Sequence, residues 1–241
     1  SVSMPSTSLE LFNDTSLYNV DGVPGSRGQV IFMNFNNKFL QNTEIRKALS
    51  MSIDKQNYAD IINKGASVPA TGLYPDFMAF GGADGYKFDI DGANAMLDNA
   101  GIIDGNGNGI RELNGEDISL RLLTYSTKAE LANFCNEIAS SAKNIGIDIS
   151  VEVYESVAEQ QKTGDFDLMM VSFTMVPTGD PQYFADIAFR TGGSSNYGGY
   201  SNAEVDKLIE ELDVEFDSER RTELAKEIQQ KIIDDAGYIV V

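Results

Sequence analysis

The stretch that most constrains the fold is an apolar run, Phe166–Phe173, which ends abruptly in a loop rich in proline and glycine. The run carries one acid, Asp167, near its start and has no helical period, which favours a strand covered on both faces. Pro177, Gly179 and Pro181 stop any regular element and predict a shaped loop. Open α/β sheets bind ligands at such loops. This loop is either a ligand loop or an ordinary connection, and the run alone favours neither.

Patterns on both sides of the run alternate between strand and helix periods. Gln29–Phe35, Ile118–Thr124 and Ile147–Val153 have the composition or alternation of strands. Leu131–Ile145 carries an apolar stripe at helical spacing, and Ser218–Asp235 carries another. This alternation predicts an α/β fold with parallel strands inside its sheet.

Helix starts are predicted from side chains that can cap them. Asp54 and Asp91 each precede a helical pattern, and Ser201 forms a capping box with Glu204. Asp180 stands directly before Pro181, a favoured first residue of a helix, so we expect it to act mainly as a cap.

The charge balance excludes some partners. With 18 basic and 37 acidic residues, the chain has a net charge of −19, which argues against DNA, RNA or anionic lipid as a partner. The chain has no histidine, so imidazole-based catalysis is excluded. Cys135 lies on the apolar face of a predicted helix and is expected to be an inert core thiol.

An Asp- and Asn-rich loop resembles the front of a calcium-binding loop. Oxygen-bearing side chains at alternate positions, with glycine at the sixth, fit the pattern, but Gly115 occupies the twelfth position, where a glutamate is needed. The alternatives are a weak calcium site and an unoccupied Asn-Gly turn. The calcium ligands would be Asp104, Asn106, Asn108 and Glu112.

Several blocks of the chain carry recognisable motifs. One contains Arg46, then Ile53-Asp54-Lys55, then Gly65 followed by Pro69-Ala70. Another is the short helix that ends at Gly101, and a third is GDPQYF, followed by GGSSNYGGYSNAEVDKLI. These motifs resemble family 5 of the extracellular solute-binding proteins, the peptide- and nickel-binding subunits of ABC importers. The resemblance covers about Gln29 to Val241, with five blocks in the family's order.

This resemblance implies a fold and a division of the chain. It implies a lobe like those of type II periplasmic binding proteins, with a mixed sheet flanked by helices. Residues 1–28 are expected to be a lead-in segment and residues 29–241 a single α/β ligand-binding lobe. The first lobe of the two-lobe clamshell is expected to lie outside this chain.

The resemblance also implies a function: capture of a small solute by closure of two lobes, and its delivery to a membrane permease of an ABC transporter. The solute would be an oligopeptide, a dipeptide, or nickel or another metal as a chelate. The implied location is extracytoplasmic, either as a cell-surface lipoprotein or in the periplasm, and no resident cofactor is implied. The alternative is a secreted carboxylate-dependent glycoside hydrolase or another extracellular enzyme, but nothing in the sequence selects two of its acids, so we expect no enzyme.

The ligand-binding residues are expected in the loop after the apolar run. Peptide-binding members commonly carry an aspartate a few residues before the proline of this loop, and this sequence lacks it there, which leaves the solute class open. Hydroxyls, backbone amides and apolar walls of the loop are expected to contact the ligand, with two tyrosines as further candidates. The expected set is Thr174, Met175, Val176, Pro177, Thr178, Gly179, Asp180, Tyr183 and Tyr197.

Overall fold

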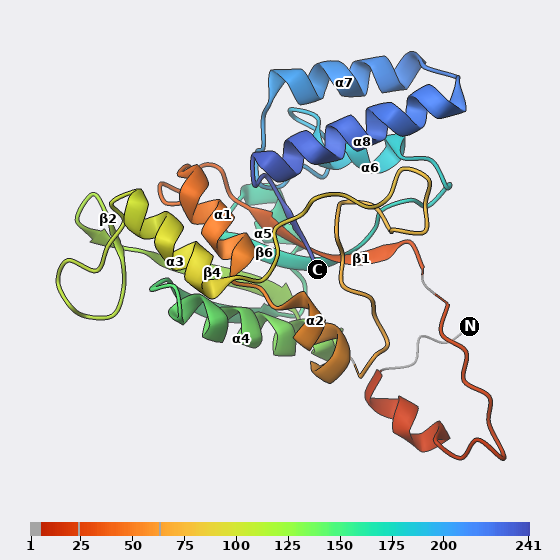
Figure 1. Ribbon diagram of the computed structural model, residues 1–241, viewed down its shortest axis with the longest axis horizontal. Helices are drawn as coiled ribbons and strands as arrows, with labels where there is room; N and C mark the ends of the chain where they lie inside the picture. The colour runs from red at the N-terminus through yellow and green to blue at the C-terminus, as the bar shows by residue number, and fades with distance from the viewer. Residues whose placement is uncertain (1–5, 24, 63) are drawn as a thin grey trace.

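A computed structural model describes residues 6–23, 25–62 and 64–241 of the chain (Figure 1). Its centre is a five-stranded mixed sheet with the strand order β5-β4-β6-β1-β7. Strand β4 is parallel to both β5 and β6, whereas β1 is antiparallel to both β6 and β7. The strands are β1 (Arg27–Met33), β4 (Ser119–Tyr125), β5 (Asp148–Tyr154), β6 (Leu168–Thr174) and β7 (Ile239–Val240), and a separate small hairpin joins β2 (Glu112–Leu113) to β3 (Glu116–Asp117).

Helices cover both faces of this sheet, so the expected α/β lobe with a mixed sheet is confirmed. Figure 1 shows α6, α7 and α8 on one side and α1, α3 and α4 on the other. The α-helices are α1 (Thr43–Met51), α2 (Lys55–Asn57), α3 (Ile90–Asn99), α4 (Ala129–Lys143), α5 (Ala158–Thr163), α6 (Gln182–Phe189), α7 (Ala203–Val214) and α8 (Ser218–Asp234). A 3-10 helix spans Ser6–Phe12 and a π-helix spans Tyr58–Ile62.

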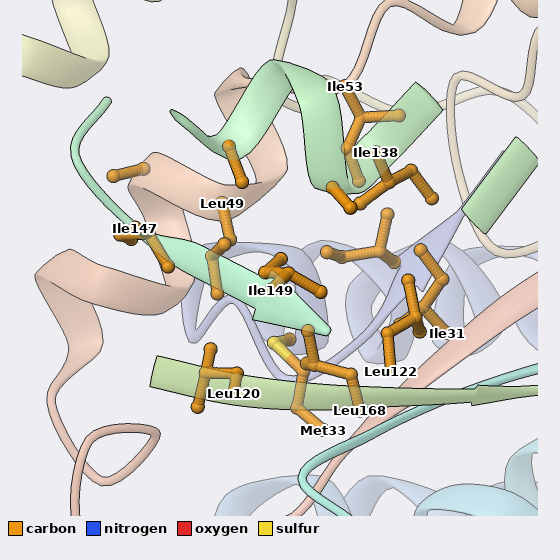
Figure 2. Packing of buried hydrophobic residues seen from close by; sticks show 14 of the residues in the cluster. Ile31, Met33, Leu49, Ile53, Leu120, Leu122, Ile138, Ile147, Ile149 and Leu168 are labelled. Atoms are coloured by element: carbon orange, nitrogen blue, oxygen red, sulfur yellow. The ribbon is translucent and has the colours of Figure 1, made fainter. Parts of the chain in front are cut away.

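The apolar run is explained by burial on both faces of the sheet. In β6, Leu168 and Met170 belong to the core on the α4 side, and Met169 and Val171 belong to the core on the α6–α8 side. Figure 2 shows the first of these cores, in which strand residues meet side chains from the helices. Its labelled members include Ile31, Leu122 and Leu168 from strands and Leu49 and Ile138 from helices.

Two of the predicted helix caps are wrong by one or two residues. Asn202, not Ser201, caps α7: its backbone is extended, and its side-chain oxygen accepts from the amides of Glu204 and Val205. Asp89, not Asp91, caps α3 and accepts from the amide of Gly92. A cap must have non-helical backbone, and residue 91 already lies inside the helix.

The lead-in segment contains a short helix. Part of it, residues 1–5 and 24, lies outside the described residues. Ser6–Phe12 forms the 3-10 helix, which Figure 1 shows beside the body of the lobe, and β1 begins at Arg27, two residues before the predicted start. The division into residues 1–28 and 29–241 stays a prediction.

Candidate functional site

The candidate site lies at one edge of the sheet. Because β4, β5 and β6 run in the same direction, their carboxyl ends meet at this edge. Strand β1 runs the opposite way and begins there, with Arg27 paired to Thr174 at the end of β6. Beyond the end of β7, the amide of Val241 donates to the carbonyl of Gln29 at 2.9 Å. The edge therefore combines the ends of β4, β5, β6 and β7 with the start of β1.

The predicted ligand loop leaves β6 at this edge. The amide of Met175 donates to the carbonyl of Ser26 at 2.9 Å, which ties the loop to the segment before β1. Met175 and Val176 are 2% and 4% exposed and belong to the core on the α6–α8 side. Their side chains support the loop from beneath, so they do not form the exposed apolar walls that the sequence led us to expect.

The tip of the loop is exposed. Pro177 and Thr178 are exposed, and Gly179 adopts a left-handed backbone (φ 78°) that other residues rarely adopt. The amide of Gly179 donates to the carbonyl of Val176 at 3.2 Å, so it closes the turn and is not free for a ligand. Thr178 thus remains the best-presented hydrogen-bonding group of the tip.

Asp180 is held by an ion pair. Both of its carboxylate oxygens accept from Arg221 Nη2 at 2.7 Å. Arg221 Nη1 also donates to the carbonyls of Leu212 and Glu215, each at 2.7 Å. Asp180 Oδ1 accepts from the amide of Gln182 at 2.9 Å, although the cap position of α6 is Pro181 and not Asp180. Asp180 thus joins the loop to α8, a role that the predicted cap did not include.

The two tyrosines lie in different surroundings. Tyr183 is in the first turn of α6 and is about half exposed. Tyr197 packs edge-on against Phe32 in the core on the α6–α8 side, with ring centroids 5.1 Å apart. A third tyrosine, Tyr74, was missed by the sequence analysis: it is buried and donates to the carbonyl of Pro181 at 2.9 Å. It has no periodic or motif signal, because it lies in the irregular segment before α3.

A polar group on the α4 side of the same edge was also missed. Lys128 Nζ donates to Ser172 Oγ at 3.0 Å, and the amide of Ser172 donates to the hydroxyl of Tyr125 at 3.2 Å. Burial lowers the pKa of Lys128, and the positive charge of Arg27 lowers it further. Because Arg27 and Lys128 are far apart in the sequence, no local pattern could predict that they lie close together.

The Asp104 loop lies away from this edge and is held by its own hydrogen bonds. Asp104 accepts from the amides of Gly107, Asn108 and Gly109 at 2.7–3.1 Å. The side-chain amides of Asn106 and Asn108 donate to Asp117 at 3.1 and 2.8 Å, and Glu112 lies in β2. Within residues 6–23, 25–62 and 64–241, no group of three or more acidic or cysteine side chains could hold a metal ion.

Two further observations concern the chain as a whole. Cys135 is fully buried, and burial raises the pKa of its thiol to about 12, which confirms an inert core thiol. No helix in the described part of the chain is long and apolar enough to cross a membrane.

Comparison with known proteins identifies related sequences. The family described as "Bacterial extracellular solute-binding proteins, family 5 Middle" matches residues 1–196. The nickel-binding protein NikA of Staphylococcus aureus is 28% identical over 206 residues, a match covering 85% of this chain and 40% of that protein. The dipeptide-binding protein DppE of Bacillus subtilis is 30% identical over 219 residues, covering 86% and 38%. The chain thus spans about two fifths of the length of these relatives.

Solved structures show the same fold. The oligopeptide-binding protein AppA from Bacillus subtilis, in complex with a nonapeptide, superposes with a TM-score of 0.85 at 24% identity, covering 97% of this chain and 48% of that one. NikA from Staphylococcus aureus, in complex with Ni(L-His)2, superposes with a TM-score of 0.82 at 26% identity, covering 98% and 49%.

Proposed function

The chain belongs to family 5 of the bacterial extracellular solute-binding proteins, and on this premise we propose that it is one lobe of the substrate-binding component of an ABC importer. The observation that carries the proposal is the family match over residues 1–196. Relatives named for binding nickel, dipeptides and oligopeptides support a small solute of one of these classes. The glycoside hydrolase alternative finds no support among these relatives.

The geometry supports a place for the ligand. In the proposed full-length protein, a first lobe faces the carboxyl edge of the sheet, where β1 begins and β7 ends. The chain would connect to that first lobe at two neighbouring points, at the start of β1 and at the end of β7. Two connections side by side are suited to act as a hinge, so closure of the lobes would enclose a solute against this edge. The loop that follows β6, with Thr174 and Thr178, would form part of the cleft wall.

The remaining parts of the proposal follow from the family. The closed, ligand-bound form would deliver the solute to a membrane permease, and the protein would act outside the cytoplasm, in the periplasm or as a cell-surface lipoprotein. A weak calcium site at the Asp104 loop is not required for this activity. If calcium binds there, its role would be local and structural.

Calorimetry on the full-length protein tests the proposal. The ligands are peptides of two to nine residues and nickel with L-histidine, since relatives are named for or solved with these classes. We expect a micromolar or tighter dissociation constant for at least one class. We also expect residues 1–241 alone to bind that ligand much more weakly, because half of the cleft would be absent. Failure of the full-length protein to bind any of them would overturn the proposal.

A further inference from the structure

We propose that Asn114 is a site of spontaneous covalent modification: deamidation through attack by the backbone amide of Gly115. This inference goes beyond the proposed function and does not depend on it. It starts from a sequence feature that the candidate site does not use. The chain contains three Asn-Gly pairs, and all of them lie between Asp104 and Asp117. Because the dipeptide is the same in each pair, only the structure around it distinguishes one pair from another.

Asparagine followed by glycine is prone to this reaction because glycine has no side chain to hinder the attack. The amide nitrogen of the glycine bonds to the side-chain carbonyl carbon of the asparagine, its proton passes to the departing nitrogen, and ammonia leaves. Water then opens the resulting ring at one of its two carbonyls. The products are aspartate and isoaspartate, in which the main chain runs through the former side chain. The net reaction consumes a water molecule and releases ammonia.

Hydrogen bonds hold both reacting groups at Asn106 and Asn108. The amides that would attack, those of Gly107 and Gly109, donate to the carboxylate of Asp104 at 2.7 and 2.8 Å. The side-chain nitrogens that would leave donate to the carboxylate at the end of β3, at 3.1 and 2.8 Å. The two side-chain oxygens accept from the backbone amides two residues further on, at 3.0 and 2.8 Å. The ring cannot close until these groups separate.

The reacting groups of Asn114 and Gly115 have no such partners. Within residues 6–23, 25–62 and 64–241, no hydrogen bond involves the side chain of Asn114 or the backbone amide of Gly115. The two residues form the turn between β2 and β3, with φ of 55° and 79°, both positive as in a type I′ turn. Both are exposed, and the space around the Cα atom of Gly115 is open to water. The hairpin has two residue pairs, so its turn distorts at small cost.

Modification of this turn would loosen the Asp104 loop. Isoaspartate adds a carbon atom to the main chain, and a two-residue turn cannot take up this extra length while both strand pairs keep their register. The register has a consequence outside the hairpin, because Asp117 of β3 accepts the hydrogen bonds from the side chains of Asn106 and Asn108. A displaced β3 would therefore withdraw one of the two carboxylates that hold the loop.

Ageing of the full-length protein in mildly alkaline buffer tests the proposal. Peptide mapping by mass spectrometry follows conversion at each asparagine, and chromatography separates isoaspartate from aspartate. We expect Asn114 to convert about tenfold faster than Asn106 or Asn108, because the latter two must first lose hydrogen bonds on both reacting groups. In the chain unfolded by urea, the three sites should convert at similar rates.

Three results of this experiment would overturn the proposal. One is conversion of Asn106 or Asn108 in the folded protein at least as fast as that of Asn114. Another is the same ratio of rates in the folded and the unfolded chain, since the structure would then play no part. The third is an Asn114 that stays intact in the folded protein under conditions that convert it in the unfolded chain.

Variants test the protection of the other two sites. Asp104→Ala removes the acceptor of both glycine amides, so conversion at Asn106 and Asn108 should rise toward the rate at Asn114. The matched control is Glu112→Gln, which removes an acid of the same hairpin that holds neither amide, and all three rates should stay unchanged. Melting curves establish that each variant is folded. Unchanged rates in Asp104→Ala would contradict protection by these hydrogen bonds.

Hydrogen exchange of the aged protein tests the effect on the loop. The amides of Gly107 and Gly109 should exchange faster once isoaspartate has formed at position 114, because β3 no longer holds the loop in place. The reference is the same protein kept in mildly acidic buffer, in which the glycine amide loses its proton less readily. Equal exchange in the two samples would overturn the proposed link between the turn and the Asp104 loop.

Discussion

The two sides of the carboxyl edge differ in how far their polar groups are satisfied. On the α6–α8 side, Asp180 and Arg221 neutralise each other, and Arg221 also satisfies two backbone carbonyls. On the α4 side, Arg27 and Lys128 have no carboxylate partner in the described chain, and the Gln29 side-chain oxygen has no donor. A polar group that is satisfied within the lobe stabilises it, whereas a buried polar group without a partner costs free energy. The two sides of one edge therefore differ in how far the lobe itself neutralises their charged groups.

The largest expected effect comes from breaking the ion pair between Asp180 and Arg221 on the α6–α8 side. Arg221→Met should lower the free energy of unfolding by about 2–3 kcal/mol, because it leaves Asp180 unpaired and two carbonyls without a donor. Chemical denaturation of the full-length protein measures this change. The control is Arg220→Met on the same helix, where the ion pairs are more exposed and the change should stay within about 0.5 kcal/mol. Equal effects in the two variants would contradict a scaffold role for Arg221.

Removing the acid of the same pair should have a smaller effect. Asp180→Ala should lower the free energy of unfolding by about 1 kcal/mol, since the amide of Gln182 loses its acceptor while Arg221 keeps its hydrogen bonds to the carbonyls of Leu212 and Glu215. Ligand affinity should change little. A variant that keeps its melting temperature but no longer binds ligand would show that Asp180 contacts the solute directly.

The loop threonines should show the opposite behaviour. Neither hydroxyl of Thr174 and Thr178 makes a hydrogen bond with a described residue, so replacing both with alanine should cost little stability. Ligand binding should weaken by about 1 kcal/mol, roughly fivefold, if each hydroxyl contributes a modest hydrogen bond. Calorimetry and thermal melting of the same sample separate the two effects. Normal binding by the double variant would remove these hydroxyls from the site.

The smallest effect is expected at the Asp104 loop. Like Asp180, the carboxylate of Asp104 already has partners within the protein, because it accepts hydrogen bonds from three backbone amides. A site with a millimolar dissociation constant would add about 0.4 kcal/mol at 1 mM calcium, which raises the melting temperature by roughly 1 °C. Thermal melts with calcium or EDTA measure this. A large rise at micromolar calcium, lost in Asp104→Ala, would mean that the loop is a true calcium site.

Much of the fold could be predicted from local patterns. The apolar run of β6 indicated a strand buried on both faces, and alternation located β4 and β5 within a residue or two. The caps at Asp89 and Asn202 were missed because several polar residues stand near each helix start, and only the backbone conformation selects one of them.

The loop after β6 was predictable from the sequence, but the burial of its residues was not. The loop after β6 was located from its prolines and glycine, yet two of its expected contact residues, Met175 and Val176, proved to be core. The sequence shows that such residues are apolar and lie in a loop. It does not show which way the loop folds over the sheet, and here it returns toward Ser26.

By itself, the sequence determined the family, the α/β class and the buried strand before the Pro- and Gly-rich loop, because these depend on periodicity and on motifs in a fixed order. The tertiary structure alone decided which polar groups find partners. Asp180 meets Arg221 across 41 positions, and Lys128 meets Ser172 across 44. Strand register and helix packing bring these groups together. Since a charge is neutralised only by what lies beside it in space, no local pattern could separate the paired acid from the unpaired cations.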